Sequence, residues 1–238
     1  MEILPAIIAE SFEDLQYKMS QVKGLVKTVQ IDVCDGRFVP SKSWPYIGDE
    51  DNDFERILRE SEGFPFWESL DFEADLMISD PEKSAEDWIT AGAKGIVLHI
   101  ESSKELPNFI KELRKKYGYP IESAVTVEIG IALNPDTPNE MLDEYLKADA
   151  EGRTLADFVQ FMGIDRIGFQ GQEFNGDILK KIRDLRKKYP DVVISVDGGV
   201  NFDNAGDLKK AGANKLISGS ALYESEDIGE AIEEMRNI

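Results

Sequence analysis

Short runs of apolar, often β-branched residues alternate along the whole chain with longer stretches in which apolar residues recur every three or four positions. The short runs are almost continuously hydrophobic, which is typical of strands in a parallel sheet that is covered on both faces. We predict strands at residues 3–8, 28–33, 70–77, 95–100, 125–133, 158–162, 192–196 and 215–219.

The stretches between these strands have the period of amphipathic helices. The stretch at 178–189 is the clearest, because Ile178, Ile182 and Leu185 fall on one face, while Lys180 and Arg183 lie elsewhere around the helix. We predict helices at residues 12–22, 53–60, 84–91, 106–117, 139–146, 178–189, 204–211 and 228–236.

Two internal echoes support a repeated strand–helix unit. The segment at 91–97 resembles the segment at 211–217, at a spacing of 211 − 91 = 120 residues, or about four units of roughly 30 residues each. Leu-Arg-Lys-Lys-Tyr occurs at 113–117 and again at 185–189. Eight alternations without a leftover segment or linker predict one α/β domain, residues 1–238, folded as a single (β/α)8 TIM barrel.

Two segments are longer than the usual connections of a compact barrel. The first, at 41–52, is acidic and contains Trp44 and Tyr46. It follows a strand, so we expect it on the face where barrel active sites lie, covering the site. The second, at 148–156, follows a helix, so we expect it on the opposite face.

The composition fits a globular protein in a reducing compartment. The chain has 238 residues, of which 42% are hydrophobic, enough to bury a large core. Cys34 is the single cysteine, which excludes a disulfide framework, and we interpret it as a small buried hydrophobe. The N-terminus lacks the basic region of a signal peptide, and no apolar run approaches the ~20 residues of a membrane span. We therefore expect a cytoplasmic protein with no membrane partner.

Acidic residues outnumber basic residues by 47 to 27, for a formal net charge of −20. This balance argues against a nucleic-acid partner, because affinity for nucleic acid comes largely from basic contacts to phosphate. Solubility is the simplest explanation of the charge. An anionic small substrate stays open, because backbone N–H groups and helix N-termini bind phosphate without net positive charge.

Asp32 and Asp197 are the candidate acid–base residues, and each lies at the end of a buried apolar strand. The alternative is a turn-forming aspartate before glycine, which is the better interpretation of Asp35 before Gly36. For Asp32 and Asp197 we favour function, because an uncompensated buried carboxylate is costly. Their strands are three steps apart around an eight-strand ring, so the two side chains would flank a small substrate from different sides. Proton transfer beside a carbonyl requires this arrangement.

Glycine-rich loops follow the last three predicted strands. Phosphate sites in such barrels form at these loops, where glycines let backbone N–H groups approach the anion. The alternative is simple tight turning. Three such loops in adjacent positions favour a phosphate site, and its candidate residues are Gly168, Gly171, Gly198, Gly199, Gly219 and Ser220.

Three further side chains at strand ends are candidate substrate contacts. His99 is the single histidine, so a zinc site built from several histidines is excluded. A hydrogen-bonded histidine near the core is as good an interpretation as a substrate contact. Met77 and Met162 are interpreted first as barrel packing and second as an apolar floor beneath a substrate.

Segments along the entire chain resemble the ribulose-phosphate 3-epimerase family. The most characteristic is Asp-Gly-Arg-Phe-Val-Pro at 35–40, and others lie at 4–9, 75–82, 130–138, 168–174 and 195–200. The resemblance implies a barrel of the ribulose-phosphate-binding type that inverts C3 of a ketopentose 5-phosphate with a divalent metal ion. It also implies that Asp32 and Asp197 are the acid/base aspartates and metal ligands.

The chain departs from the family's pattern where the metal would bind. Gln30 and Asp75 stand at the positions of the family's two ligand histidines, and Ala6 replaces a substrate-contacting serine. The resulting set of Gln30, Asp32, Asp75 and Asp197 offers only oxygen, which suits Mg²⁺ or Mn²⁺ better than Zn²⁺. With no metal at all, three converging carboxylates would repel one another and at least one would hold a proton.

The expected function is the interconversion of ribulose 5-phosphate and xylulose 5-phosphate through an enediolate, with proton transfer by Asp32 and Asp197. Two alternatives stay open. One is an isomerase, epimerase or aldolase-like enzyme for another phosphorylated ketose, although no lysine stands at an obvious strand end for Schiff-base chemistry. The other is a catalytically inactive phosphosugar-binding barrel. The expected partner is a phosphorylated ketose, and a homo-oligomer is left open.

Overall fold

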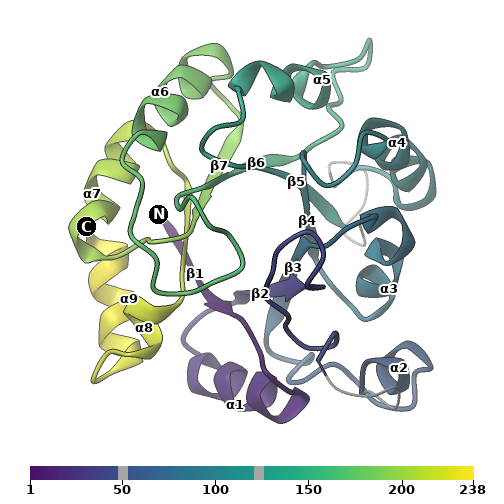
Figure 1. Cartoon of the computed structure of the whole chain (residues 1–238), viewed down its shortest axis with the longest axis vertical. Helices are drawn as coiled ribbons and strands as arrows, with labels where there is room; N and C mark the ends of the chain where they lie inside the picture. The colour runs from purple at the N-terminus through teal and green to yellow at the C-terminus, as the bar shows by residue number, and fades with distance from the viewer. Residues whose placement is uncertain (48–52, 121–125) are drawn as a thin grey trace.

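Eight parallel strands close into a barrel that helices surround (Figure 1). The computed structural model describes residues 1–47, 53–120 and 126–238. The strands are β1 (Glu2–Ile7), β2 (Thr28–Cys34), β3 (Asp71–Met77), β4 (Gly95–His99), β5 (Glu128–Leu133), β6 (Phe158–Met162), β7 (Val193–Asp197) and β8 (Lys215–Ser218). They follow chain order around the ring, and β8 pairs with β1. The predicted α/β class and TIM-barrel architecture are confirmed.

Helices follow the strands around the ring. They are α1 (Phe12–Val22), α2 (Asp53–Leu58), α3 (Ala85–Thr90), α4 (Leu106–Tyr117), α5 (Asp143–Leu146), α6 (Ile178–Lys188), α7 (Phe202–Ala211), α8 (Ser220–Tyr223) and α9 (Ile228–Asn237), with 3-10 turns η1 (Pro81–Lys83) and η2 (Asn139–Leu142). The helix predicted at 139–146 is divided into η2 and α5. The prediction missed η1 and α8, which are too short to carry a helical period. Within the described ranges, no helix is long and apolar enough to cross a membrane.

Helix α7 begins two residues before the predicted start because Asn201 caps it. The Asn201 side chain accepts hydrogen bonds from the backbone N–H groups of Asp203 and Asn204. The Asn204 side chain accepts one in return from the Asn201 N–H. This capping box satisfies donors that a helix start would otherwise leave unpaired, and it places α7 directly after the glycine turn that ends β7.

The outer core lies between the barrel and the helices, and Trp44 is at its centre. Its ring lies 5.4–6.3 Å from those of Phe12, Phe54, Phe64 and Trp88, measured between centroids. Trp44 belongs to the segment at 41–52 that we expected to cover the site, and it is only 3% exposed. The described part of this segment is therefore anchored in the outer core. Residues 48–52 lie outside the described ranges.

The barrel lumen holds a smaller inner core that includes Cys34 and Met77. Burial raises the pKa of the Cys34 thiol to about 12, which makes it a poor nucleophile and agrees with its interpretation as a buried hydrophobe. At the N-terminal end of the strands, Lys215 Nζ lies 3.3 Å from Glu73 Oε2 and 4.5 Å from the centre of the Phe158 ring. This ion pair closes the end of the barrel opposite the strand-end aspartates.

The segment at 148–156 joins α5 to β6, so it lies at the N-terminal end of the strands, as expected. Arg153 pairs with Asp149 at 3.0 Å and with Glu151 at 3.1 Å. The Tyr119 ring lies between two guanidinium groups, with those of Arg153 and Arg114 at 5.0 Å and 4.9 Å from its centre. The segment thus packs on the end of α4, away from the strand-end aspartates.

Arg114, in the first copy of the repeated Leu-Arg-Lys-Lys-Tyr segment, fastens the turn between α4 and β5. It is 3% exposed and donates hydrogen bonds to the backbone carbonyls of Gly118, Val127 and Leu155. It also forms an ion pair with Asp157, the residue before β6. One buried guanidinium therefore joins a helix end to the starts of two strands.

Arg186, in the second copy, makes the equivalent contacts. It donates to the carbonyls of Pro190, Val192 and Gly212, and to the side-chain oxygen of Asn214, the residue before β8. Each of these partners occupies the same position relative to its helix or strand as the corresponding partner of Arg114. The repeated Leu-Arg-Lys-Lys-Tyr segment is thus explained by an arginine that, in both copies, holds the turn between a helix and the following strand by hydrogen bonds.

We expect the Arg114→Met substitution to lower the free energy of unfolding by about 2–4 kcal/mol, because it leaves the Asp157 carboxylate and the backbone carbonyls without the guanidinium. Urea unfolding gives the measurement. Lys115→Met is the matched control, since Lys115 is 71% exposed and pairs at the surface with Glu112, so its loss should stay within about 0.5 kcal/mol. Similar small losses in both variants would contradict the structural role of Arg114.

Candidate active site

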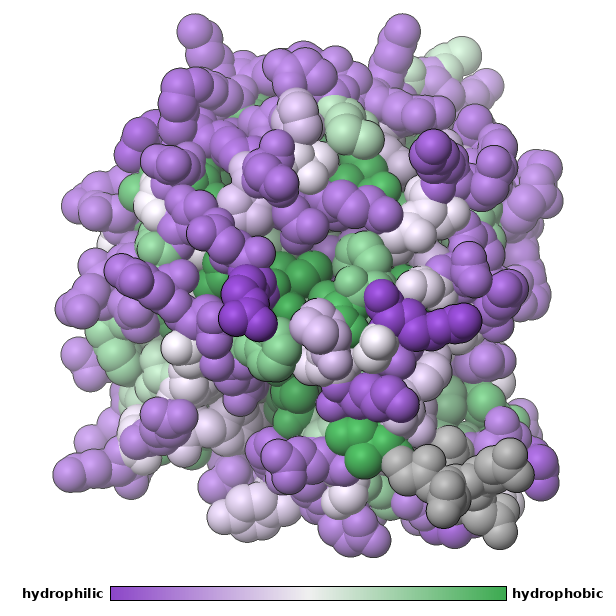
Figure 2. All heavy atoms as spheres, in the orientation of Figure 1, coloured by the Kyte–Doolittle hydropathy of each residue, from purple (hydrophilic) through white to green (hydrophobic). Residues whose placement is uncertain are grey.

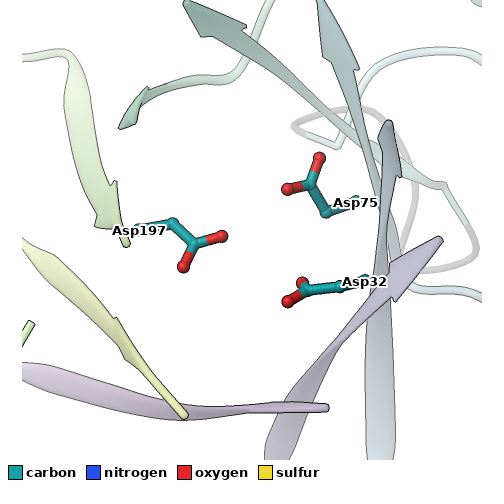
Figure 3. Close-up of side chains that lie close together, drawn as sticks. All are labelled: Asp32, Asp75 and Asp197. Atoms are coloured by element: carbon teal, nitrogen blue, oxygen red, sulfur yellow. The ribbon is translucent and has the colours of Figure 1, made fainter. Parts of the chain in front are cut away.

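Three aspartates converge inside the C-terminal end of the barrel. Asp32 lies on β2 beside Asp75 on β3, with which it is in register, and Asp197 ends β7. Their carboxylates point toward one another from opposite sides of the lumen (Figure 3). One oxygen from each lies within 4.8 Å of the others, and the residues are 5%, 0% and 7% exposed. Asp32, Asp75 and Asp197 are called the aspartate cluster below.

Two buried glutamines offer their amide nitrogens to the aspartate cluster. Gln30 Nε2 lies 2.9 Å from Asp32 Oδ1 and 2.7 Å from Asp197 Oδ2. Gln160 Nε2 lies 3.2 Å from Asp75 Oδ2 and 3.5 Å from Asp197 Oδ2. Neither glutamine oxygen has a partner among the described residues. Gln30, which we predicted as a metal ligand, thus turns its nitrogen rather than its oxygen toward the carboxylates.

His99 makes a hydrogen bond with Asp75 of the aspartate cluster. It is fully buried on β4, and its Nε2 lies 3.0 Å from Asp75 Oδ1. Burial acts to lower the pKa of His99, but the Asp75 carboxylate, together with Glu101 and Asp32, outweighs this effect, so the pKa is raised. His99 does not line the cavity described below, so its position matches the interpretation as a hydrogen-bonded, near-core histidine.

The electrostatics of the cluster favour a shared proton or a bound cation. Burial raises the pKa of Asp32 to about 7, with repulsion from Asp75 as the next cause. Burial likewise raises the pKa of Asp197 well above its usual value, followed by repulsion from Asp32 and Asp75. In the described part of the chain, no lysine or arginine bonds to any of the three carboxylates. The charge is therefore compensated only by neutral donors and one histidine.

A cavity of about 490 Å³ opens above the cluster. Asp32 and Asp197 line it, together with Met77 and Met162, whereas Asp75 lies beneath. The six residues predicted for the phosphate site also line it: Gly168, Gly171, Gly198, Gly199, Gly219 and Ser220. Figure 2 shows hydrophobic atoms gathered near the middle of this face, within a largely hydrophilic surface. The fold thus brings the predicted acid–base residues and the predicted phosphate loops to one cavity.

Loop packing requires glycine at two cavity positions, Gly199 and Gly219. Gly199 has φ +68°, and a side-chain carbon there would lie 2.9 Å from the Phe174 backbone. A carbon on Gly219 would lie 2.6 Å from Gln170 Nε2, which donates to the backbone carbonyl of Ala6. Tight packing of the loops therefore accounts for glycine at these two positions, whether or not the loops bind an anion.

The loop between β6 and α6 passes in front of the barrel (Figure 1). It contacts the loop after β2, because a carbon on Gly168 would lie 2.5 Å from Ser41 Oγ and 2.9 Å from Val39 Cγ2. Ile164 and Ile167 of the β6–α6 loop pack into the inner core with Val39. This contact encloses one side of the cavity.

Gln160, which contacts the aspartate cluster, was not predicted from the sequence. The available signal was a polar side chain inside the otherwise apolar run at 158–162. Gln170, Asn201 and Glu224 also line the cavity and were not predicted. They lie outside the helices, in a loop or at a helix end, where no hydrophobic period marks which side chains face inward.

The cluster fits a hard divalent cation. Three buried carboxylates supply negative charge and oxygen donors, which are the ligands that Mg²⁺ and Mn²⁺ prefer. The predicted ligand Asp75 lies with the other two aspartates, although it is 43 residues from Asp32 along the chain. The cluster is thus able to hold a metal ion through Asp32, Asp75 and Asp197.

Comparison with known proteins places this site in a family context. A sequence profile described as the ribulose-phosphate 3 epimerase family matches residues 2–223. The ribulose-phosphate 3-epimerase of Bacillus subtilis is 32% identical over 242 residues, covering 99% of this chain and 98% of that protein. The ribulose-phosphate 3-epimerase of Synechocystis sp. is 32% identical over 246 residues, covering 99% and 93%.

Solved structures extend the likeness at the level of the fold. A 3-hexulose-6-phosphate synthase superposes with a TM-score of 0.63, covering 100% of this chain and 99% of that chain. The sequence identity is 22%, so this similarity concerns the barrel and its connections alone.

We expect Gly171→Ala to weaken the binding of ribulose 5-phosphate by about tenfold, or roughly 1.4 kcal/mol, because the new methyl group stands in the lining of the expected phosphate site. Gly171 has φ +68° and nothing within 4 Å of an added carbon. The backbone strain that alanine adds at this φ should therefore lower the stability of the fold by only about 1–2 kcal/mol. Gly152 is the matched control, with φ +79°, open space, and a place in the distant 148–156 segment. Equal affinities of the two variants by calorimetry would contradict a phosphate site at this loop.

We expect protein purified without chelators to carry Mg²⁺ or Mn²⁺ rather than zinc, because the cluster offers oxygen ligands. Asp75→Asn should weaken Mn²⁺ binding by about 10–100-fold, measured by titration together with elemental analysis. Asp71→Asn, an exposed position on the same strand, should leave the affinity unchanged. Stoichiometric zinc that survives dialysis and disappears in Asp75→Asn would show that the oxygen-ligand argument is wrong.

Proposed function

The chain belongs to the ribulose-phosphate 3-epimerase family, and on that premise we propose that it inverts C3 of ribulose 5-phosphate to give xylulose 5-phosphate, and catalyses the reverse reaction. One observation carries the proposal. Asp32 and Asp197 line one cavity from opposite sides of the barrel (Figure 3). Inversion at carbon requires one group on each face of the reacting centre, and these carboxylates provide them.

The proposed reaction moves one proton at each step. A carboxylate on one face takes the C3 proton, and the electron pair of the broken C–H bond forms the C2–C3 double bond of an enediolate. The C2 oxygen then carries the negative charge. The carboxylic acid on the opposite face gives its proton to C3, the C2 carbonyl re-forms, and the configuration is inverted. The enzyme ends with the proton on the other aspartate, so the reverse reaction uses the same groups in exchanged roles.

This mechanism needs one ionised and one protonated aspartate at the start. The raised pKa values of Asp32 and Asp197, which burial and mutual repulsion cause, support a single proton shared between them near neutral pH. A proton shared by two opposed carboxyl groups supplies both a base and an acid.

Asp32, Asp75 and Asp197 would hold the divalent cation, which when bound would supply positive charge that stabilises an enediolate. Gln30 Nε2 keeps Asp32 and Asp197 at a fixed separation by donating to both. Met77 and Met162 belong to the apolar part of the cavity wall, which would exclude water from the reacting carbons.

The phosphate end of the substrate is assigned to the glycine loops after β6, β7 and β8. Among the described residues, no lysine or arginine lines the cavity, so the backbone N–H groups of these loops, with Ser220, are the donors suited to a phosphate. That no lysine of residues 1–47, 53–120 or 126–238 lines the cavity also argues against a Schiff-base aldolase. With the phosphate at the glycine loops and the aspartates at the other end, the sugar chain is oriented across the cavity.

The direct test is exchange of the C3 hydrogen of ribulose 5-phosphate in D₂O, followed by mass spectrometry. Chelator-treated protein is assayed alone and with Mg²⁺, Mn²⁺, Fe²⁺ or Zn²⁺. We expect deuterium at C3 together with xylulose 5-phosphate. If no ketose phosphate exchanges with any of these metals, while calorimetry still detects binding, the alternative of an inactive phosphosugar-binding barrel is favoured.

We expect Asp32→Asn and Asp197→Asn each to lower turnover by about 10²–10⁴-fold, because asparagine keeps the shape but cannot act as a base. Each variant should retain C3–H exchange for the epimer whose base remains, without completing inversion. Metal content is measured first, since loss of the cation would imitate loss of the base. Full epimerase activity in metal-replete Asp197→Asn would exclude the two-base mechanism.

A further inference from the structure

Gln160 is a buried glutamine that the two-aspartate mechanism does not use. It is the middle residue of β6, it is 0% exposed, and its neighbours Val159 and Phe161 are apolar. Its register partners are Ala132 on β5 and Ser195 on β7. A polar side chain at this depth destabilises the fold unless hydrogen bonds compensate its burial.

The oxygen acceptors that compensate the burial of Gln160 among the described residues both belong to the aspartate cluster. Its Nε2 faces Asp75 Oδ2 at 3.2 Å and Asp197 Oδ2 at 3.5 Å, and it lies 4.0 Å from Met162 Sδ. Its Oε1 has no partner in the part of the chain that the structure describes. Because ionised carboxylates only accept hydrogen bonds, the NH₂ end of the amide is the end that faces them. Gln160 is therefore oriented by the aspartates.

The amide contacts are distributed unequally over the two acid–base residues. Asp197 Oδ2 accepts a hydrogen bond from Gln30 Nε2 at 2.7 Å and a longer one from Gln160 Nε2 at 3.5 Å. Asp32 receives Gln30 but makes no hydrogen bond to Gln160. Removal of the Gln160 amide would thus take one side-chain donor from Asp197, which keeps Gln30, and one from Asp75, which keeps His99, while it leaves the contacts of Asp32 in place.

We propose that Gln160 is a positioning residue that holds the Asp197 carboxylate, against repulsion from Asp75, in the orientation from which it exchanges a proton with C3. The inference rests on the proposed epimerase function and deepens it. Gln160 acts through Asp197 and does not touch the reacting atoms. Since Asp197 serves one face of C3 and Asp32 the other, the effect of Gln160 is one-sided.

The test replaces Gln160 with methionine, which has nearly the same length and volume but no N–H donors. The initial rate of C3–H exchange in D₂O is measured from each epimer, and Asp197→Asn identifies the epimer that depends on Asp197. In Gln160→Met, exchange from that epimer should fall by about 10–100-fold, because a displacement of about 1 Å at a reacting group costs rates of this order. Exchange from the other epimer should fall less than about threefold, and KM should change little.

Ser195→Ala is the matched control. Ser195 lies beside Gln160 in register, is also 0% exposed, and its hydroxyl has no partner among the described residues. It shares the depth of Gln160 in the barrel but not its contacts with the cluster, so the ratio of the two exchange rates should equal that of the unsubstituted protein. Thermal melting of both variants establishes that they are folded.

Crystal structures of the unsubstituted protein and of Gln160→Met give a second measurement that does not depend on turnover. The Asp197 carboxylate should turn away from its position beside Gln30 in the variant. Equal losses of exchange for both epimers, or an unmoved Asp197 carboxylate, would overturn the positioning role. Absence of exchange in the unsubstituted protein would overturn the epimerase function instead, and the crystal structures would then decide the role of Gln160.

Discussion

Repulsion among three carboxylates enclosed in one end of a barrel is the interaction on which the site depends. Like charges a few ångströms apart and removed from water repel strongly, and no lysine or arginine in the described part of the chain bonds to them. The side-chain amides of Gln30 and Gln160 donate hydrogen bonds to the carboxylates, and His99 contacts Asp75, so these groups offset part of the repulsion. What remains uncompensated favours a proton or a hard cation. The same condition makes the aspartates suitable for acid–base chemistry.

The contacts that stabilise the barrel and the candidate active site lie at opposite ends of it. At the N-terminal end, the Glu73–Lys215 ion pair closes the lumen, and Arg114 and Arg186 fasten the helix–strand turns. At the C-terminal end, glycine loops and an open cavity replace such contacts. Residues at the first end can be rigid without obstructing a substrate, which agrees with the general placement of barrel active sites.

The acidic character of the chain extends into the cavity, where Asp32, Asp197 and Glu224 are the charged lining residues in the described part of the chain. On the proposed function, a phosphorylated sugar enters this cavity although the formal net charge of the protein is −20. Backbone N–H groups resolve the conflict, because they are dipoles that the fold aims at one point without adding charge. Glycines at the loop ends let those groups approach a ligand closely.

The sequence by itself determined the order of strands and helices and the strand-end positions of Asp32 and Asp197. Apolar runs and helical periods are local properties, and all strand ends of a parallel barrel share one face. Only the tertiary structure decided that Gln160 meets Asp75 and Asp197, which lie 85 and 37 residues away, and that His99 faces Asp75 instead of the cavity. Strand tilt and stagger in the closed ring set which side chains meet in the lumen, and no local pattern carries that information.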